Sequence, residues 1–220
     1  MPRLDAQPLL YLITAGTLPA AAATDEIAVR ALLQVIAAAV RAQISLVQIR
    51  EKTAAPRTLY EVTRRAAALT RGSRTRLLVN DRADIARAAG ADGVHLTTQS
   101  MDTADVRRAF GPDFLIGVST HNEREARAAY TGGADFITFG PIYNTPDKRG
   151  YGPPLGLARL HAIVAGVAPL PVLALGGIAS RHAPDIARSG AAGLAAIRLW
   201  SDWHTLEATA QQACLIFTQH

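Results

Sequence analysis

The sequence predicts a (β/α)₈ barrel of the TIM-barrel class, formed as a single domain over residues 1–220. Eight short runs rich in β-branched and other apolar residues alternate with eight segments of helical periodicity. Four of these runs follow a turn of small residues, as in AGADGV and GGADFI, which is typical of the return from a helix to a strand. An open doubly wound sheet is the alternative, but it usually has fewer strands and does not require eight regular units.

Each predicted strand is followed by a predicted helix. The strands lie at 9–14, 45–50, 76–80, 92–96, 114–119, 135–140, 171–177 and 193–198. The helices lie at 24–41, 56–71, 82–89, 102–110, 122–131, 155–165, 180–188 and 202–217. Thr24, Asp102 and Ser180 stand at the predicted starts of three helices, where a side-chain oxygen can accept a hydrogen bond from a free backbone N–H group. A chain of 220 residues is long enough to bury a large core in this arrangement.

Composition and charge indicate a small anionic ligand and exclude several other partners. The chain has a net charge of +5, but its arginines are scattered, with no long basic run and few aromatic residues among them. We therefore expect a phosphorylated small molecule as the partner and no nucleic acid. Cys214 is the only cysteine and lies at helical spacing among apolar residues, which indicates a core residue and a reducing compartment. With neither a secretory leader nor an apolar stretch of spanning length, the sequence predicts a cytoplasmic protein without membrane contact.

The end of the second predicted strand carries an unusual set of polar residues. In a (β/α)₈ barrel the site is built at the carboxyl ends of the strands and in the loops that follow them. Gln48, Arg50 and Lys52 alternate along the chain and therefore share one face, where burial is costly unless a ligand or a counter-charge meets them. We predict that they line the mouth of the barrel. The alternative is that Lys52 lies in the loop and Arg50 pairs with a structural carboxylate.

Three further strands have polar or titratable residues at or near their ends. Asn80 and Asp81 end the third strand, and Asp81 is either a metal ligand or the cap of the next helix. His121 follows the fifth strand, where it can act as an acid or a base, or face solvent beside a capping Asn122. His95 lies within the fourth strand and is predicted to be a structural core residue.

The longest predicted loop, residues 140–156, follows the sixth strand and holds four prolines and four glycines. Loops of this length often serve as active-site lids. Thr145, Lys148 and Arg149 can meet an anion there, although Asp147 opposes one.

The seventh and eighth strands end in residues suited to binding phosphate. Gly176 and Gly177 end the seventh strand, and Ile197 and Arg198 end the eighth. Glycine beside a following helix lets backbone N–H groups and the helix dipole approach a phosphate. The loops after these two strands often hold a phosphate in barrels of this class.

Taken together, these segments resemble the thiamine phosphate synthase/TenI family over nearly the whole chain. The resemblance rests on LYLIT, VQIREK, LLVNDRADIARAAGADGVHL, GVSTH, GADFITFGPIYNTPDK and PVLALGGI. It implies a (β/α)₈ barrel, commonly a homodimer, that acts on the thiazole phosphate branch of thiamine synthesis. Synthase members join a pyrimidine methyl diphosphate to thiazole phosphate with Mg²⁺ on the departing diphosphate. TenI members isomerise a thiazole carboxylate phosphate by proton transfer, without a metal.

The resemblance also implies roles for single residues. The substrate-binding residues are Gln48, Arg50, Lys52, Asn80, Ser119, Thr145 and Lys148. Gly177 and the backbone at Ile197 and Arg198 match the cradle for the thiazole phosphate, and we expect the adjacent Gly176 to bind the phosphate with them. His121 matches the acid/base of TenI enzymes, and Asp81 matches the first Mg²⁺ ligand of synthases. For a tautomerase we expect His121 to move the proton while Lys52 or Arg50 holds the substrate carboxylate.

Two departures from the synthase pattern decide the predicted activity. Ser100 stands where synthases have the aspartate that is their second metal ligand, and Asp147 replaces a threonine of the loop. A neutral hydroxyl is a poor Mg²⁺ ligand, and a carboxylate repels a diphosphate. Asp102 can replace the missing ligand only if the loop shifts by two residues. The predicted function is therefore a TenI-like thiazole tautomerase without a cofactor. A synthase with Mg²⁺ at Asp81 is the alternative, and a non-catalytic thiazole phosphate-binding protein is the third hypothesis.

Overall fold

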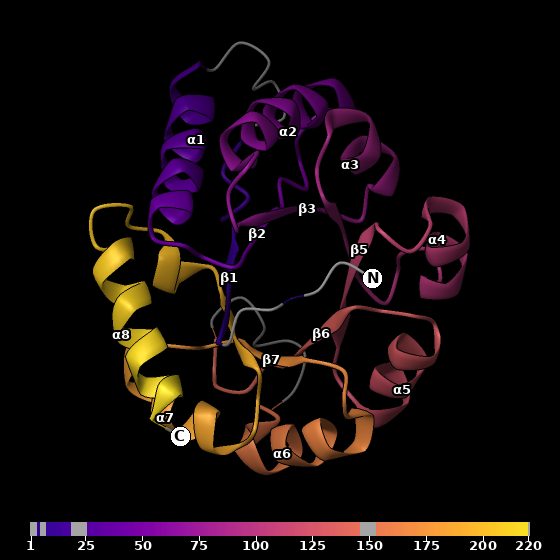
Figure 1. The fold of residues 1–220 in the computed structure, drawn as a ribbon, viewed down its shortest axis with the longest axis vertical. Helices are drawn as coiled ribbons and strands as arrows, with labels where there is room; N and C mark the ends of the chain where they lie inside the picture. Colours follow the sequence, from indigo (N-terminus) through magenta and orange to yellow (C-terminus); the bar gives the residue numbers. More distant parts are fainter. Residues whose placement is uncertain (1–3, 5–7, 19–25, 146–152, 220) are drawn as a thin grey trace.

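The computed structural model describes Leu4 and residues 8–18, 26–145 and 153–219. Within these residues, eight parallel strands form a closed barrel in chain order, and the helices form a ring around it (Figure 1). The strands are β1 (Leu9–Ile13), β2 (Leu46–Ile49), β3 (Arg76–Asn80), β4 (Gly93–Leu96), β5 (Leu115–Thr120), β6 (Phe136–Phe139), β7 (Val172–Leu175) and β8 (Gly193–Ala196). The helices are α1 (Glu26–Arg41), α2 (Pro56–Thr70), α3 (Ala83–Ala89), α4 (Thr103–Phe110), α5 (Glu123–Thr131), α6 (Gly156–Val167), α7 (Ala183–Arg188) and α8 (Leu206–Thr218). The predicted (β/α)₈ barrel is confirmed.

The last two strands are shorter than predicted. β7 ends at Leu175, because Gly176 and Gly177 take positive φ angles of 97° and 66°, which a strand cannot continue. β8 ends at Ala196 and is followed by a 3₁₀ helix, Arg198–Trp200. Both loops therefore begin earlier than the apolar runs indicate.

The predicted helix starts are corrected at two places. The helix predicted at 180–188 is divided into a 3₁₀ helix, Ser180–His182, and α7, so that Ser180 lies inside the first piece and caps neither. Asp102 does precede α4, but its side chain makes no capping hydrogen bond. Thr24 lies outside the described residues.

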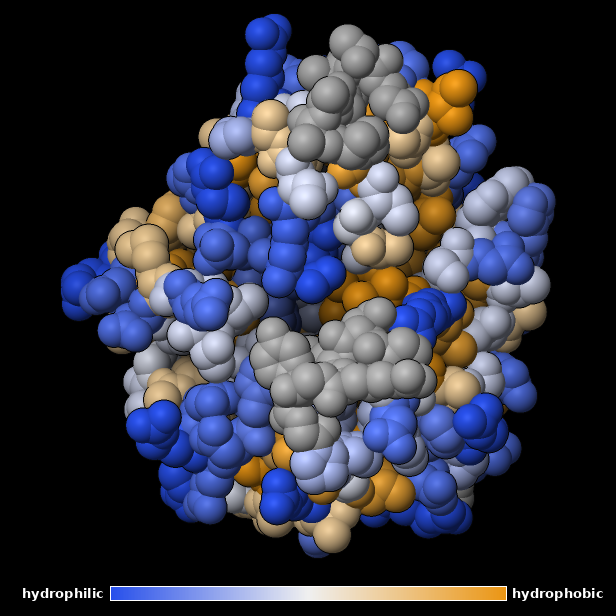
Figure 2. All heavy atoms as spheres, turned by 180° about the vertical axis from the view of Figure 1, so that it is seen from behind, coloured by the Kyte–Doolittle hydropathy of each residue, from blue (hydrophilic) through white to orange (hydrophobic). Residues whose placement is uncertain are grey.

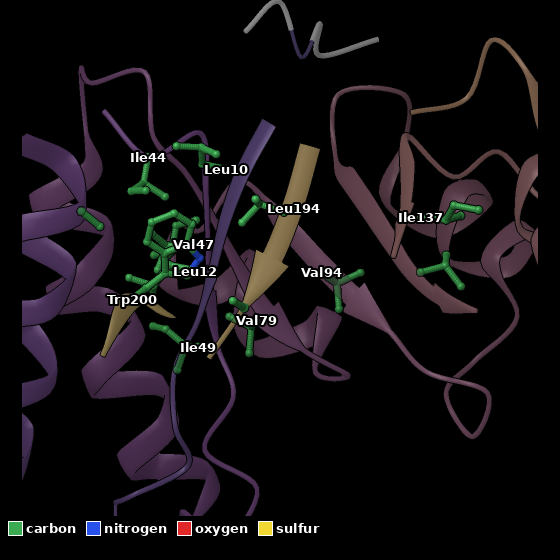
Figure 3. Close-up of a cluster of buried hydrophobic side chains, with 14 of the residues drawn as sticks. Leu10, Leu12, Ile44, Val47, Ile49, Val79, Val94, Ile137, Leu194 and Trp200 are labelled. Carbon is green, nitrogen blue, oxygen red and sulfur yellow. The ribbon is translucent and has the colours of Figure 1, made fainter. Parts of the chain in front are cut away.

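Two apolar layers hold the barrel together. The outer layer joins strands to helices and includes the side chains in Figure 3, among them Leu10, Leu12, Val47, Ile49 and Trp200. The fully buried members of the inner layer all come from the strands: Leu9, Tyr11, Ile13, Leu46, Leu78, Leu115, Phe136, Leu173 and Ala195. Successive side chains of a strand point to opposite faces, so this alternation identifies which side chains point toward the barrel axis. Among the described residues, no helix has the length and apolar character needed to cross a membrane.

Candidate active site

The carboxyl ends of β2 to β6 place a row of polar side chains at the mouth of the barrel. Counting in steps of two from the inner apolar layer reaches polar residues on β2, β3, β5 and β6, and on β4 the side chain of His95 contacts Tyr11 of that layer. We call them the polar wall, which consists of Gln48, Arg50, Asn80, His95, Ser119 and Thr138. Figure 2 views the molecule from the side opposite to Figure 1, and hydrophilic residues border one side of a hollow near the centre of this face, with hydrophobic residues on another side. The polar wall therefore lies where a barrel of this class builds its site.

Gln48 is the deepest amide of the polar wall. It is only 1% exposed, and its Nε2 has no hydrogen-bond partner within the described residues. A buried donor left unpaired costs about 1–3 kcal/mol. Gln48 therefore keeps a donor available for a ligand that reaches the floor of the mouth.

Arg50 and Lys52 differ in burial, although sequence alternation places them on one face. Arg50 is half-buried, and its backbone N–H donates to Thr14 Oγ1 at 2.8 Å. Lys52 is exposed and lies in the turn after β2. Arg50 thus belongs to the mouth itself. Lys52 lies in the loop, which was the alternative to its predicted place at the mouth.

Glu51 is a residue that the sequence analysis missed. Its carboxylate is buried and accepts hydrogen bonds from Thr14 Oγ1 at 2.6 Å and from the backbone N–H groups of Gly16 and Leu18 at 3.3 and 2.9 Å. It thereby fixes the chain that leaves β1 against the end of β2. Alternation is the signal that would have found it, since Glu51 must point away from the face of Arg50.

Asp81 is exposed at the rim, directly after β3. Its φ angle of 64° is unusual for a residue with a side chain, and its backbone N–H donates to the carbonyl oxygen of His95 at 2.9 Å. Arg82, not Asp81, occupies the position before α3, so the helix-cap interpretation of Asp81 is wrong. The neighbouring Asn80 is half-buried, and alternation from Leu78 places it on the inner face of β3.

The residues around Asp81 do not fit a Mg²⁺ site with two protein carboxylates. Ser100 Oγ accepts a hydrogen bond from the backbone N–H of Thr97 at 2.8 Å and contacts Thr97 Oγ1 at 3.1 Å, so it is committed to its own loop. Asp102 is exposed at the start of α4. Over the part of the chain that the structure describes, no group of three or more His, Cys, Asp or Glu side chains can hold a metal ion. Mg²⁺ prefers charged oxygen ligands, and Ser100 offers a neutral hydroxyl where a second carboxylate would be expected.

His95 is the centre of the polar wall. Its ring is 2% exposed, with Nδ1 3.1 Å from Tyr11 Oη and Nε2 2.9 Å from Ser119 Oγ. Burial, helped by the nearby positive charge of Arg50, lowers its pKa to about 3, so the ring is neutral at physiological pH. Gly117 makes room for the ring, since a Cβ there would lie 2.7 Å from His95 Nδ1 and 2.3 Å from Phe136 Cζ. The predicted burial of His95 is confirmed, but its hydrogen bonds were not foreseen.

His121 lies just past β5 and pairs with Glu125. The imidazole Nδ1 is 3.0 Å from Glu125 Oε2, which also accepts the backbone N–H of His121 at 2.7 Å. Asn122 caps α5 by accepting the backbone N–H of Glu125 at 3.0 Å. Partial burial opposes ionisation of Glu125, but hydrogen bonds from His121 and Asn122 hold its pKa below the usual value. The capping spacing Asn-x-x-Glu was the available signal for Glu125.

A groove of about 500 Å³ opens beside the polar wall between α4 and α5. Leu96 and Val118 contribute apolar side chains to it, while Ser119 and Glu125 contribute polar ones. Ser119 therefore belongs both to the inner hydrogen bonds of the barrel and to an open surface.

The loops after β6 and β7 pack closely against each other. A Cβ at Gly177 would lie 2.5 Å from Asn144 O, and one at Gly176 would lie 2.7 Å from the Pro141 backbone, so both glycines are needed for this contact. Thr145 is half-buried at the end of the described part of this loop, whereas Lys148, Arg149 and Asp147 lie outside the described residues. After β8, Ile197 is half-buried and Arg198 is exposed.

Comparisons with known proteins agree on the family. The family model described as thiamine monophosphate synthase (TMP-TENI) matches residues 11–199. The thiamine-phosphate synthase of Anaeromyxobacter dehalogenans is 43% identical over 188 residues, which are 86% of this chain and 78% of that protein. The thiamine-phosphate synthase of Chloroflexus aurantiacus is 42% identical over 163 residues, 74% of each chain. The solved thiamine phosphate pyrophosphorylase of Pyrococcus furiosus superposes with a TM-score of 0.77 at 28% identity and covers 96% of both chains. On these matches, the chain belongs to the thiamine monophosphate synthase (TMP-TENI) family.

Proposed function

We propose that the protein is a thiamine-phosphate synthase, a transferase that joins a pyrimidine methyl diphosphate to thiazole phosphate and releases diphosphate. The names of relatives that share 42–43% of their aligned residues support this activity over the tautomerase that the sequence departures favoured. The observation that carries the proposal is the division of the mouth into two unlike parts. A polar wall occupies β2 to β6, and the ends of β7 and β8 offer backbone groups around Gly176, Gly177 and Ile197. A transferase needs such a pair of sites for its two substrates.

On this proposal the two parts of the mouth bind different phosphates. The backbone N–H groups at Gly176, Gly177, Ile197 and Arg198 receive the phosphate of the thiazole substrate. The pyrimidine diphosphate lies along the polar wall, where Gln48 Nε2 can donate to the pyrimidine. Asn80, Arg50 and Ser119 then face the diphosphate, and Thr145 and Lys148 extend this group from the loop after β6.

The reaction breaks the C–O bond between the methyl carbon and the diphosphate while the thiazole forms a new bond to the same carbon. Negative charge therefore grows on the departing diphosphate. Arg50 and Ser119 lie at the mouth of the barrel. The positive charge of Arg50 and the hydroxyl donor of Ser119 can stabilise the negative charge of the diphosphate without rearranging. Because the protein side chains do not fit a two-carboxylate metal site, no step is assigned to Mg²⁺. Mg²⁺ can bind through one carboxylate and substrate phosphates, so it belongs in the assay.

One observation favours the tautomerase as a second candidate. Glu125 holds the ring of His121 through Nδ1, and a carboxylate–imidazole pair is suited to moving a proton. On this reading His121 transfers the proton of a thiazole carboxylate phosphate and Lys52 holds the carboxylate. Lys52 is exposed in its loop, whereas Arg50 is half-buried at the mouth. Burial therefore supports Arg50 better than Lys52 as the residue that holds the substrate carboxylate.

The deciding experiment offers both sets of substrates to the purified protein. Pyrimidine methyl diphosphate and thiazole phosphate are supplied with Mg²⁺ and then with EDTA, and thiamine phosphate and diphosphate are measured. We expect stoichiometric formation of both products. A protein that forms neither, but converts thiazole carboxylate phosphate in a reaction lost in His121→Asn, is a tautomerase instead. Binding of thiazole phosphate with no turnover of either substrate set would leave only the non-catalytic hypothesis.

The remaining proposals concern the whole protein. We infer a cytoplasmic enzyme formed as one domain over residues 1–220, with small-molecule substrates and no nucleic acid or membrane partner. A homodimer is the expected assembly, and sedimentation equilibrium of the purified protein measures it.

A further inference from the structure

Four side chains inside the barrel form one hydrogen-bonded chain. It runs from Tyr11 on β1 to His95 on β4, then to Ser119 on β5 and Thr138 on β6. Tyr11 and Thr138 are 0% exposed, whereas Ser119 is half-buried and lines the groove beside the mouth. The chain therefore connects the closed interior of the barrel with the open site.

The direction of the first bond follows from the burial of Tyr11. Burial raises the pKa of Tyr11 well above its usual value, so the phenol keeps its proton. Among the described residues, His95 Nδ1 is the only hydrogen-bond partner of that hydroxyl. If Nδ1 carried the ring proton, the Tyr11 proton would be buried without an acceptor, which costs about 1–3 kcal/mol. Tyr11 therefore donates to Nδ1, and the single proton of the neutral His95 ring lies on Nε2.

Pairing each buried donor with an acceptor also determines the direction of the Ser119 hydroxyl proton. Ser119 Oγ accepts from His95 Nε2 at 2.9 Å and from the buried Thr138 hydroxyl at 3.4 Å. Thr138 Oγ1 has no other partner in the described part of the chain, so it must donate. Both acceptor positions of Ser119 are then used, and its own proton is left for a group in the mouth.

We propose that His95, held by Tyr11, is a positioning residue that makes Ser119 a fixed hydrogen-bond donor to an anionic oxygen of the diphosphate substrate. The identity of the ligand rests on the proposed synthase activity, but the direction of the hydrogen bonds does not. A group that can only donate selects an acceptor, and the guanidinium of Arg50, close enough to act on His95 electrostatically, favours an anionic one. Tyr11 and His95 touch no substrate in this scheme and act through Ser119.

The first test is independent of activity. Nitrogen-15 NMR of the histidine rings reports which nitrogen carries the proton. We expect the Nε2–H tautomer for His95 throughout pH 5–9, and a mixture of tautomers in Tyr11→Phe. His161 is an internal reference, because its Nδ1 lies 3.1 Å from the carbonyl oxygen of Ser189 and must carry a proton. A His95 ring that is protonated on Nδ1 would overturn the proposal.

The second test is a double-mutant cycle read by calorimetric binding of inorganic pyrophosphate. Ser119→Ala removes one hydrogen bond to a charged group and should weaken binding about tenfold, and His95→Met should weaken it similarly. If His95 acts through Ser119, the double variant loses no more than either single variant, whereas independent roles give multiplied losses and overturn the proposal. His95→Gln, whose amide can still donate to Ser119, should restore most of the affinity.

Two controls separate the possible failures. His161→Gln makes the same exchange on the exposed face of α6 and should leave binding unchanged. Melting temperatures identify any variant that does not fold, and His95→Gln and Tyr11→Phe then carry the test in place of His95→Met. If the wild-type protein does not bind pyrophosphate, both the synthase and the ligand assigned to Ser119 are overturned. If the His95 ring still carries its proton on Nε2 in that case, the hydrogen bond from Tyr11 to His95 stands although the ligand is wrong. Failure of the synthase proposal can thus be told apart from failure of the hydrogen-bond scheme.

Discussion

At the scale of single residues, Gln48 is a buried amide whose donor, unpaired within the part of the chain that the structure describes, costs stability and is of use only to a ligand. The amide is buried, yet its Nε2 is unpaired among the described residues, although most buried polar groups in folded proteins are paired. Glu51, three residues later, is equally buried but accepts three hydrogen bonds. The contrast separates a residue that supports the structure from one that is available to a ligand.

This contrast leads to a prediction for Gln48→Met. Methionine has a similar volume and no unpaired donor, so the free energy of unfolding should rise by about 1 kcal/mol. The same change removes the donor that the pyrimidine would meet, so the KM for the pyrimidine diphosphate should rise about tenfold. Urea denaturation and steady-state kinetics measure the two effects. A variant that loses both stability and affinity would show that Gln48 is a packing residue.

The hydrogen bonds of single residues are also where sequence reasoning failed. Burial of His95 follows from its place within an apolar strand run, but its partner Tyr11 is 84 residues away and on a strand that does not neighbour β4. Alternation indicates which face a side chain takes, and it does not indicate which strands meet across the barrel axis. The loop bonds of Ser100 could not be foreseen either, because they depend on the backbone path of residues 97–100.

At the scale of elements, the sequence predicted a strand or helix correctly wherever local residue types determine that element. All eight strands were predicted because each is a short apolar run bounded by turn residues. The errors lie at ends that tertiary contacts set. Gly176 and Gly177 read as the end of a strand, but they turn the chain because residues 141–144 pack directly against them. Pro184 stands in the first turn of α7, where the longer predicted helix is divided.

Arg107 makes several polar contacts between elements at the amino-terminal end of the barrel. From α4 its guanidinium donates to the carbonyl oxygens of Gly133, Gly111 and Phe114, at 2.8, 2.9 and 2.7 Å, and to Asp135 at 2.7 Å. The side chain of Asp135 is only 4% exposed, and it also accepts the backbone N–H of Ile116. One side chain thus ties α4 to the starts of β5 and β6.

Replacing Arg107 by methionine should therefore destabilise the protein strongly. The substitution leaves a buried carboxylate and several carbonyl groups without their donor, and such losses cost about 3–5 kcal/mol. The neighbouring Arg108 pairs with Asp105 on the exposed face of the same helix, so Arg108→Met should change the free energy of unfolding by less than about 1 kcal/mol. Urea denaturation of both variants makes the comparison. Equal effects of the two substitutions would mean that the interior contacts of Arg107 contribute nothing beyond a surface ion pair.

The whole molecule divides its barrel into three environments. The outer layer against the helices is apolar, the inner layer toward the amino-terminal end is apolar, and the mouth is polar. Tyr11 and His95 lie where the second environment meets the third, with ring centroids 5.5 Å apart. A titratable ring at this boundary couples the stability of the entire barrel to pH.

The burial of His95 predicts the direction of that coupling. Its pKa is about 3 in the folded protein, whereas an imidazole in the unfolded chain has a pKa near 6.5. Between these values the unfolded chain binds the extra proton, so stability is full above about pH 6.5 and falls as the pH is lowered toward 3. One such group contributes at most about 1.4 kcal/mol per pH unit over this window.

His95→Gln isolates this contribution, because glutamine can keep the hydrogen bond to Ser119 but does not titrate. The free energy of unfolding, measured by urea denaturation from pH 7 to pH 4, should fall less steeply for the variant than for the wild type. Parallel slopes for wild type and His95→Gln would mean that His95 takes up a proton over the same pH range in the folded protein as in the unfolded chain. The ring that orients Ser119 would then be neutral only above about pH 6.5 and not throughout pH 5–9, so a measurement of whole-molecule stability also bears on the geometry of the site.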